Sequence, residues 1–141
     1  MSLSYPDELI RRVLNETRTI AVVGASSNPA RPSFSVMRWL IARGYSVAAI
    51  NPGLSGSLLG TKVYPDLMSV PEPIDMVDVF RNSEAAGALV DEALALPVPP
   101  KVIWMQLGVV NPEAARRAEM AGVTVIMDRC PVIEACRLTG L

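Results

Sequence analysis

The sequence predicts an α/β domain with a three-layer, doubly wound, Rossmann-like fold around a five-stranded, mainly parallel sheet. Short apolar runs alternate along the chain with segments of helical periodicity, which is the pattern of repeated βαβ units. Most prolines fall between these segments and separate them. The chain has 141 residues, the length of one domain, so we expect a single domain over residues 1–141.

Each predicted strand is a short, uninterrupted apolar run, as expected for parallel strands that are covered by helices on both faces. The predicted strands are residues 19–24, 47–51, 75–80, 101–106 and 123–127. Residues 52–61 are rich in Gly and Ser, and they predict a loop after the second strand.

Helix boundaries follow from residues that favour helix ends. Pro6 suits a first turn, Ser83 suits an N-cap, and Gly44 and Gly122 suit C-terminal stops. The predicted helices are residues 6–16, 33–43, 83–96, 112–121 and 133–138.

Composition excludes several classes of function. The chain has no histidine, which rules out Ser-His-Asp triads, Cys-His dyads, phosphohistidine carriers and imidazole metal sites. Its net charge of −1 shows no excess of basic residues, which a nucleic-acid-binding protein usually has. No apolar run approaches the length of a membrane span. Two cysteines and no signal-peptide pattern at the N-terminus predict a reduced, cytoplasmic protein.

The segment 24–33 joins the first predicted strand to the next helix and carries the strongest local signal. Gly24 permits close approach of the backbone, and the loop N–H groups with the helix N-terminus form an anion site suited to a pyrophosphate. The alternative is a tight turn with capping serines, because only the first glycine of the dinucleotide motif GxGxxG is present. Candidate polar ligands in the segment are Ser26, Ser27, Ser33 and Arg31.

Two further polar segments follow predicted strands. The second strand ends at Asn51, where a carboxylate usually holds the ribose of NAD, so a phosphorylated ribose would be tolerated here. Asn51 suits either a nucleotide contact or an Asn-Pro turn. Arg81 suits a ligand phosphate or a neighbouring carboxylate. Asp75 and Asp78 have an odd spacing on one strand, so they face opposite sides and do not form a catalytic pair.

Five motifs in order along the chain resemble the single-domain CoA-binding proteins, which are related to the CoA-binding domain of the succinyl-CoA synthetase alpha subunit. The resemblance extends from about residue 19 to 138. The motifs are Ile20–Ser33, Val47–Pro52, Ile74–Arg81, Val102–Gly108 and Met127–Pro131.

The resemblance implies where coenzyme A would lie. It assigns the pyrophosphate to the loop and the following helix, the nucleotide end to the loop after the second strand, and the pantetheine arm to the third and fourth strand ends. The implied residues are Gly24, Ala25, Ser26, Ser27, Asn28, Arg31, Ser33, Asn51, Pro52, Gly53, Phe80, Arg81, Met105, Gln106 and Leu107.

The chain departs from the family pattern at two places. Leu54 stands where the synthetases have a basic residue, so Lys62 or Arg31 would have to replace its contact with the ribose phosphate. Residues 134–138 read Glu-Ala-Cys-Arg-Leu, without the histidine that many single-domain relatives have.

The predicted function is binding of coenzyme A or an acyl-CoA without catalysis. The predicted partner is this small-molecule ligand, and the chain could also form a homodimer or bind a protein partner. The alternatives are an NAD(P)-dependent oxidoreductase and a nucleotide-binding subunit of an acyl-CoA enzyme. Cys130 either forms a mixed disulfide with the CoA thiol or is an inert buried cysteine.

Overall fold

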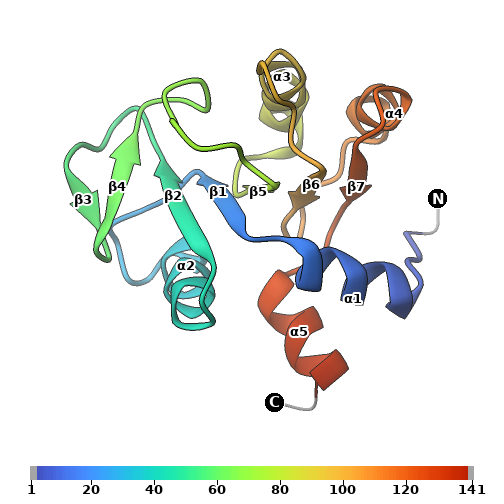
Figure 1. Ribbon diagram of the computed structural model, residues 1–141, viewed down its shortest axis with the longest axis horizontal. Coiled ribbons are helices and arrows are strands. Elements are labelled where there is room, and N and C mark those ends of the chain that lie inside the picture. The colour runs from blue at the N-terminus through green and yellow to red at the C-terminus, as the bar shows by residue number, and fades with distance from the viewer. Residues whose placement is uncertain (1–2, 140–141) are drawn as a thin grey trace.

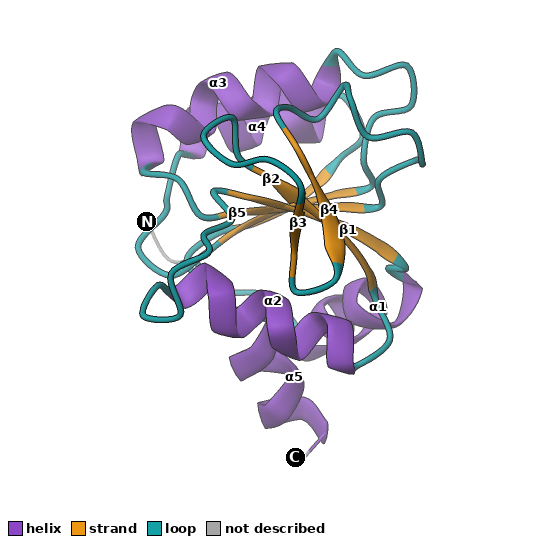
Figure 2. Cartoon of the chain, turned by 90° about the vertical axis from the view of Figure 1, so that its left-hand side faces the viewer, coloured by secondary structure: helices purple, strands orange, loops and turns teal. Residues whose placement is uncertain are grey.

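The computed structural model describes residues 3–139, and it consists of one sheet between two layers of helices (Figure 1, Figure 2). The strands are β1 (Thr19–Val23), β2 (Ser46–Ile50), β3 (Ser57–Leu58), β4 (Thr61–Tyr64), β5 (Met76–Val79), β6 (Val102–Met105) and β7 (Thr124–Ile126). The helices are α1 (Asp7–Glu16), α2 (Pro32–Ala42), α3 (Ser83–Leu94), α4 (Pro112–Met120) and α5 (Pro131–Thr139).

The strand order of the sheet is β3-β4-β2-β1-β5-β6-β7. All neighbours pair in parallel except β3 and β4. Without β3, this is the strand order of doubly wound dinucleotide-binding domains, in which the chain reverses its direction of travel across the sheet after the first half. The reversal lies between β1 and β5, and ligands of such folds bind at that point, outside the carboxyl ends of the strands.

The prediction of five strands was wrong, because the sheet formed by residues 3–139 has seven. The segment 52–61, predicted to be a loop, contains β3 and the start of β4. These strands are joined by Leu59 and Gly60, whose φ angles are 52° and 79°, as a tight two-residue hairpin requires. Leucine is rare at such a position, so the turn has no recognisable sequence signal. β4 continues the sheet beyond β2, with Ala49 opposite Val63.

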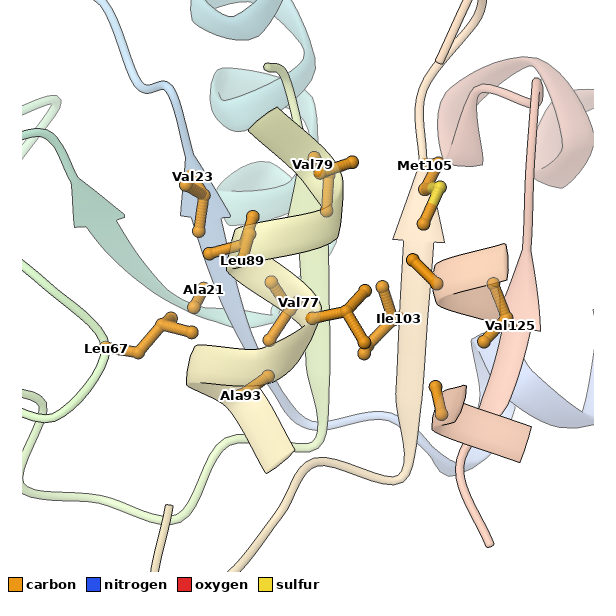
Figure 3. Packing of buried hydrophobic residues seen from close by; sticks show 14 of the residues in the cluster. Ala21, Val23, Leu67, Val77, Val79, Leu89, Ala93, Ile103, Met105 and Val125 are labelled. Atoms are coloured by element: carbon orange, nitrogen blue, oxygen red, sulfur yellow. The ribbon is translucent and has the colours of Figure 1, made fainter. Parts of the chain in front are cut away.

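Alternate residues of the strands divide the core between the two faces of the sheet. Val77 and Val79 pack toward α3 and α4 (Figure 3), whereas Met76 and Trp104 pack toward α1, α2 and α5. Figure 2 shows the two helical layers on opposite sides of the sheet. The α/β, mainly parallel, Rossmann-like fold is therefore confirmed. Among residues 3–139, no helix has the length and apolar character needed to cross a membrane.

Candidate functional site

Two cavities meet at the reversal point of the sheet. The first cavity has a volume of about 460 Å³ and lies between the ends of β1 and β2 and one side of α3. The second cavity has a volume of about 500 Å³ and lies at the start of α2, reaching to the end of β6. Both cavities are lined by Gly24, Asn51, Phe80 and Arg81. One extended ligand can therefore occupy both.

The N-terminus of α2 faces the second cavity without a side-chain cap. Arg31 occupies the N-cap position and makes no capping hydrogen bond, and Pro32 follows it. In contrast, the side chains of Asn82 and Asn111 cap α3 and α4 by accepting hydrogen bonds from backbone N–H groups. Asn82, rather than the predicted Ser83, is the N-cap of α3. Pro32 has no N–H and the Phe34 N–H donates to the Arg31 carbonyl at 3.0 Å, so the first turn of α2 keeps the Ser33 N–H available to an anion.

The loop before α2 is held by its own polar side chains. The Asn28 N–H donates to Ser26 Oγ at 3.1 Å, and the Ala30 N–H donates to Asn28 Oδ1 at 3.0 Å. Ser26 also lines the second cavity, whereas Ser27 and Asn28 line neither cavity. Asn28 therefore shapes the loop, and Ser26 both shapes it and faces the cavity.

Gly24 lies where β1 meets the loop and comes unusually close to β5. Its φ angle is 91°, a conformation that side chains rarely tolerate. A Cβ atom at this position would lie 2.6 Å from the carbonyl oxygen of Phe80. The Phe80 N–H in turn donates to the Val23 carbonyl at 2.8 Å. The floor shared by the two cavities therefore requires glycine at residue 24.

The Asn51 side chain connects two of the loops. Its Nδ2 donates to the Ala25 carbonyl at 2.7 Å, and its Oδ1 accepts from the Gly53 N–H at 2.7 Å. Both polar ends are therefore engaged within the protein. Of the two roles open from the sequence, this geometry favours the Asn-Pro turn, which positions the loop that follows β1.

Two carboxylates that the sequence reasoning did not assign line the first cavity. Asp66 follows β4 and accepts hydrogen bonds from the backbone and hydroxyl of Ser69. Glu92 lies on α3 and accepts from the Leu67 N–H at 3.1 Å. No sequence signal could have found this pair, because Asp66 follows β4, a strand that was not predicted, and Glu92 reaches the cavity through the packing of α3.

Arg31 and Arg81 supply the positive charge of the site. Arg31 lines the second cavity and Arg81 lines both, and neither forms an ion pair within residues 3–139. Lys62, the other candidate to replace the missing basic residue, lies over the ring of Tyr64 on β4 and lines neither cavity.

Two buried polar side chains lie on the same face of the sheet below the loop. Gln106 lines the second cavity, and its Oε1 has no hydrogen-bond partner among residues 3–139. Asp78 is fully buried between β1 and β6, and neither carboxylate oxygen has a partner there. Burial raises the pKa of Asp78 well above its usual value. Asp75 instead accepts from the Arg18 and Thr19 N–H groups at 2.9 and 3.0 Å.

The cavities bring together most, but not all, of the residues expected from the sequence. Eleven of these line one or both cavities: Gly24, Ala25, Ser26, Arg31, Ser33, Asn51, Pro52, Phe80, Arg81, Gln106 and Leu107. Ser27, Asn28, Gly53 and Met105 do not, and Met105 points into the core beneath α3 and α4 (Figure 3). Cys130 lies at a separate groove between α2 and α5.

The chain is similar to known proteins over most of its length. Residues 18–135 match the CoA binding domain family. The uncharacterized protein YneT of Bacillus subtilis (strain 168) is 39% identical over 121 residues, which cover 86% of this chain and 87% of YneT.

Several solved structures are also similar to this chain in fold and in sequence. A hypothetical protein from Pyrococcus horikoshii OT3 has a TM-score of 0.88 and 35% identity, covering 98% of this chain and 99% of that one. The dinucleotide-forming acetyl-coenzyme A synthetase 1 of Ca. Korarchaeum cryptofilum, in complex with phosphate and ADP, has a TM-score of 0.69 and 27% identity. The similar region covers 85% of this chain and 27% of the synthetase. The chain belongs to the CoA-binding domain family.

Proposed function

We propose that this chain binds coenzyme A at the two joined cavities and holds it without converting it. The observation that carries the proposal is the uncapped N-terminus of α2, which meets the Gly24 loop and two arginines free of ion pairs within residues 3–139. Backbone N–H groups and guanidinium groups are the donors that a pyrophosphate requires.

The two cavities divide the ligand into its parts. The pyrophosphate lies at the start of α2, in the part of the second cavity that adjoins the first. The adenosine end lies in the first cavity, where Ile50 and Leu89 offer apolar walls to a base. The pantetheine arm lies in the second cavity and runs toward Gln106 and Leu107 at the end of β6.

A nicotinamide dinucleotide is the second candidate, and one observation favours it. Asp66 and Glu92 line the first cavity, and carboxylates there can accept hydrogen bonds from an unphosphorylated ribose. Both carboxylates already accept hydrogen bonds from the segment after β4, and neither follows the second strand, where NAD enzymes place their acid. CoA therefore remains the better fit.

Calorimetric titration with CoA, NAD⁺ and NADP⁺ tests the proposal. We expect CoA to bind and the two dinucleotides to bind at least tenfold more weakly. Tight binding of NAD⁺ without binding of CoA would overturn the proposal in favour of the second candidate. Absence of binding by all three would overturn both.

Substitution of Arg81, followed by the same calorimetric titration, tests where CoA binds. Arg81→Ala removes a charge-assisted contact from both cavities and is expected to weaken CoA binding about 10- to 30-fold, corresponding to about 1.5–2 kcal/mol. Arg116→Ala, on the exposed surface of α4, is the matched control and should bind CoA as the wild type does. Equal affinities of the two variants would remove Arg81 from the site.

A further inference from the structure

A groove between α2 and α5 opens next to the proposed arm of the ligand. This α2/α5 groove has a volume of about 660 Å³, and Arg38 is the single charged residue among the described residues that line it. Most of its lining is apolar: Val36, Trp39, Ala42, Cys130, Val132 and Ile133. Both views place α2 and α5 on the same side of the sheet (Figure 1, Figure 2).

The α2/α5 groove borders the same two structural regions as the second cavity. On α2, Ser33 lines the second cavity, and Val36, one turn later, lines the groove. On the opposite side, the N–H of Arg129 donates to the carbonyl of Met105 at 3.3 Å. This hydrogen bond holds the segment that carries Cys130 beside the end of β6, where Gln106 lines the second cavity.

Gln106 provides an independent reason for a ligand to reach this end of the second cavity. Its side chain is only 6% exposed, and its Oε1 lacks a partner among the described residues. A buried amide oxygen without a hydrogen bond is costly, and a donor from a ligand would satisfy it. The N–H groups of an amide-containing arm are such donors. A ligand arm bound to Gln106 would lie beside the segment that carries Cys130, which lines the α2/α5 groove.

We propose that the α2/α5 groove holds the apolar acyl chain of an acyl-CoA. The inference rests on the proposed CoA binding and assigns the ligand's class, a thioester of a medium-length fatty acid rather than free CoA. Ile133 is 53% exposed and Trp39 is partly exposed, so an acyl chain would cover apolar surface that now faces water. The thioester is bound and not cleaved.

The experiment compares CoA, acetyl-CoA and octanoyl-CoA by calorimetry on the whole chain, with octanoyl-CoA below its micelle concentration. Each methylene that becomes fully buried strengthens binding about fourfold. Burial of about half of the six additional methylenes predicts that octanoyl-CoA binds on the order of 50-fold more tightly than acetyl-CoA. Trp39 fluorescence should change with octanoyl-CoA and not with acetyl-CoA, because the shorter chain ends before Trp39.

Ala42→Trp tests the location. Ala42 is exposed at the end of α2 and lines the groove, so a tryptophan there fills the space that the chain needs. We expect the advantage of octanoyl-CoA to fall below about fivefold, while CoA and acetyl-CoA bind unchanged. Ala95→Trp is the matched control, since Ala95 is likewise exposed at the end of a helix, α3, away from the groove.

The outcomes separate this inference from the proposed function. Failure of CoA itself to bind overturns the proposed function and this inference with it. Binding of CoA with no preference for octanoyl-CoA, or a preference that Ala42→Trp leaves intact, overturns only the acyl-chain site. A second copy of the chain is the alternative occupant of the groove, and sedimentation of the ligand-free protein tests for it. A dimer that Ala42→Trp dissociates would assign the groove to the second copy and overturn the acyl-chain site.

Discussion

Gly24→Ala should both destabilise the protein and abolish CoA binding. The new methyl group would lie 2.6 Å from the Phe80 carbonyl oxygen, and the φ angle of 91° is unfavourable for alanine. Backbone strain and the forced displacement of β5 together predict a loss of about 3 kcal/mol in the free energy of unfolding. Because Phe80 and Arg81 line both cavities, the displacement would also disrupt the site. Urea unfolding and calorimetry measure the two effects.

Gly44→Ala is a control that has the backbone strain of Gly24→Ala without the steric clash of the added methyl group. Gly44 has a φ angle of 98°, close to that of Gly24, but an added Cβ would have no atom within 4 Å. We expect this variant to lose only about 1 kcal/mol of stability and to bind CoA normally. If Gly24→Ala were no less stable than Gly44→Ala and bound CoA equally well, the close approach of β1 and β5 would have no role in the site.

Asp78→Val should stabilise the protein at neutral and alkaline pH. Both carboxylate oxygens of Asp78 are buried without a partner among residues 3–139, and its strand neighbours are Val22 and Trp104. Valine suits a buried parallel strand and leaves no polar group to satisfy. Replacement of a buried ionisable group by an apolar one predicts a gain of about 2 kcal/mol at pH 7.5. Urea unfolding between pH 4.5 and 9 measures it.

The stabilisation by Asp78→Val should increase with pH. Burial raises the pKa of Asp78 in the folded state, so the unfolded chain ionises first, near its ordinary pKa of about 3.9. Above that pH the unfolded state binds fewer protons, and the stability of the wild type falls as pH rises toward the folded-state pKa. Asp78→Val should lack this decline, so the difference between the two proteins widens with pH. A parallel decline in both would mean that Asp78 does not titrate in this way.

Asp75→Val is the matched control on the same segment of the chain. Asp75 accepts hydrogen bonds from the backbone N–H groups of Arg18 and Thr19, which would lose their acceptor. We expect this variant to be less stable than the wild type by about 1–2 kcal/mol, opposite in sign to Asp78→Val. Stabilisation by both substitutions would show that the gain at residue 78 reflects general β propensity.

Much of the fold could be predicted because its main elements carry their own signals. The predicted strand at 19–24 contains β1, and the predicted strands at 47–51, 75–80, 101–106 and 123–127 overlap β2, β5, β6 and β7. The hairpin of β3 and β4 could not be predicted in this way. β3 has two residues, and its turn contains Leu59 at positive φ, where asparagine or glycine would have signalled a turn.

The candidate site was less predictable because its geometry depends on tertiary contacts. The position of the Gly24 loop after β1 follows from βαβ topology alone. Whether a polar side chain faces a ligand depends on its other partners: Asn51 is occupied on both ends by the backbone, and Glu92 reaches the first cavity only because α3 packs over it. Met105, the last residue of β6, packs into the core beneath α3 and α4, whereas Gln106, which follows it, lines the second cavity; strand alternation predicts this difference from the sequence.

Amide chemical shifts during a CoA titration test the central claim most directly, because each backbone N–H at the loop and at the start of α2 reports separately. The account predicts the largest changes at Ser26 and Ser33, whose N–H groups have no acceptor among residues 3–139, and little change at Ala85 and Ala114, whose N–H groups are already bonded to caps. Changes centred on the starts of α3 and α4, or none near the Gly24 loop at saturating CoA, would contradict it.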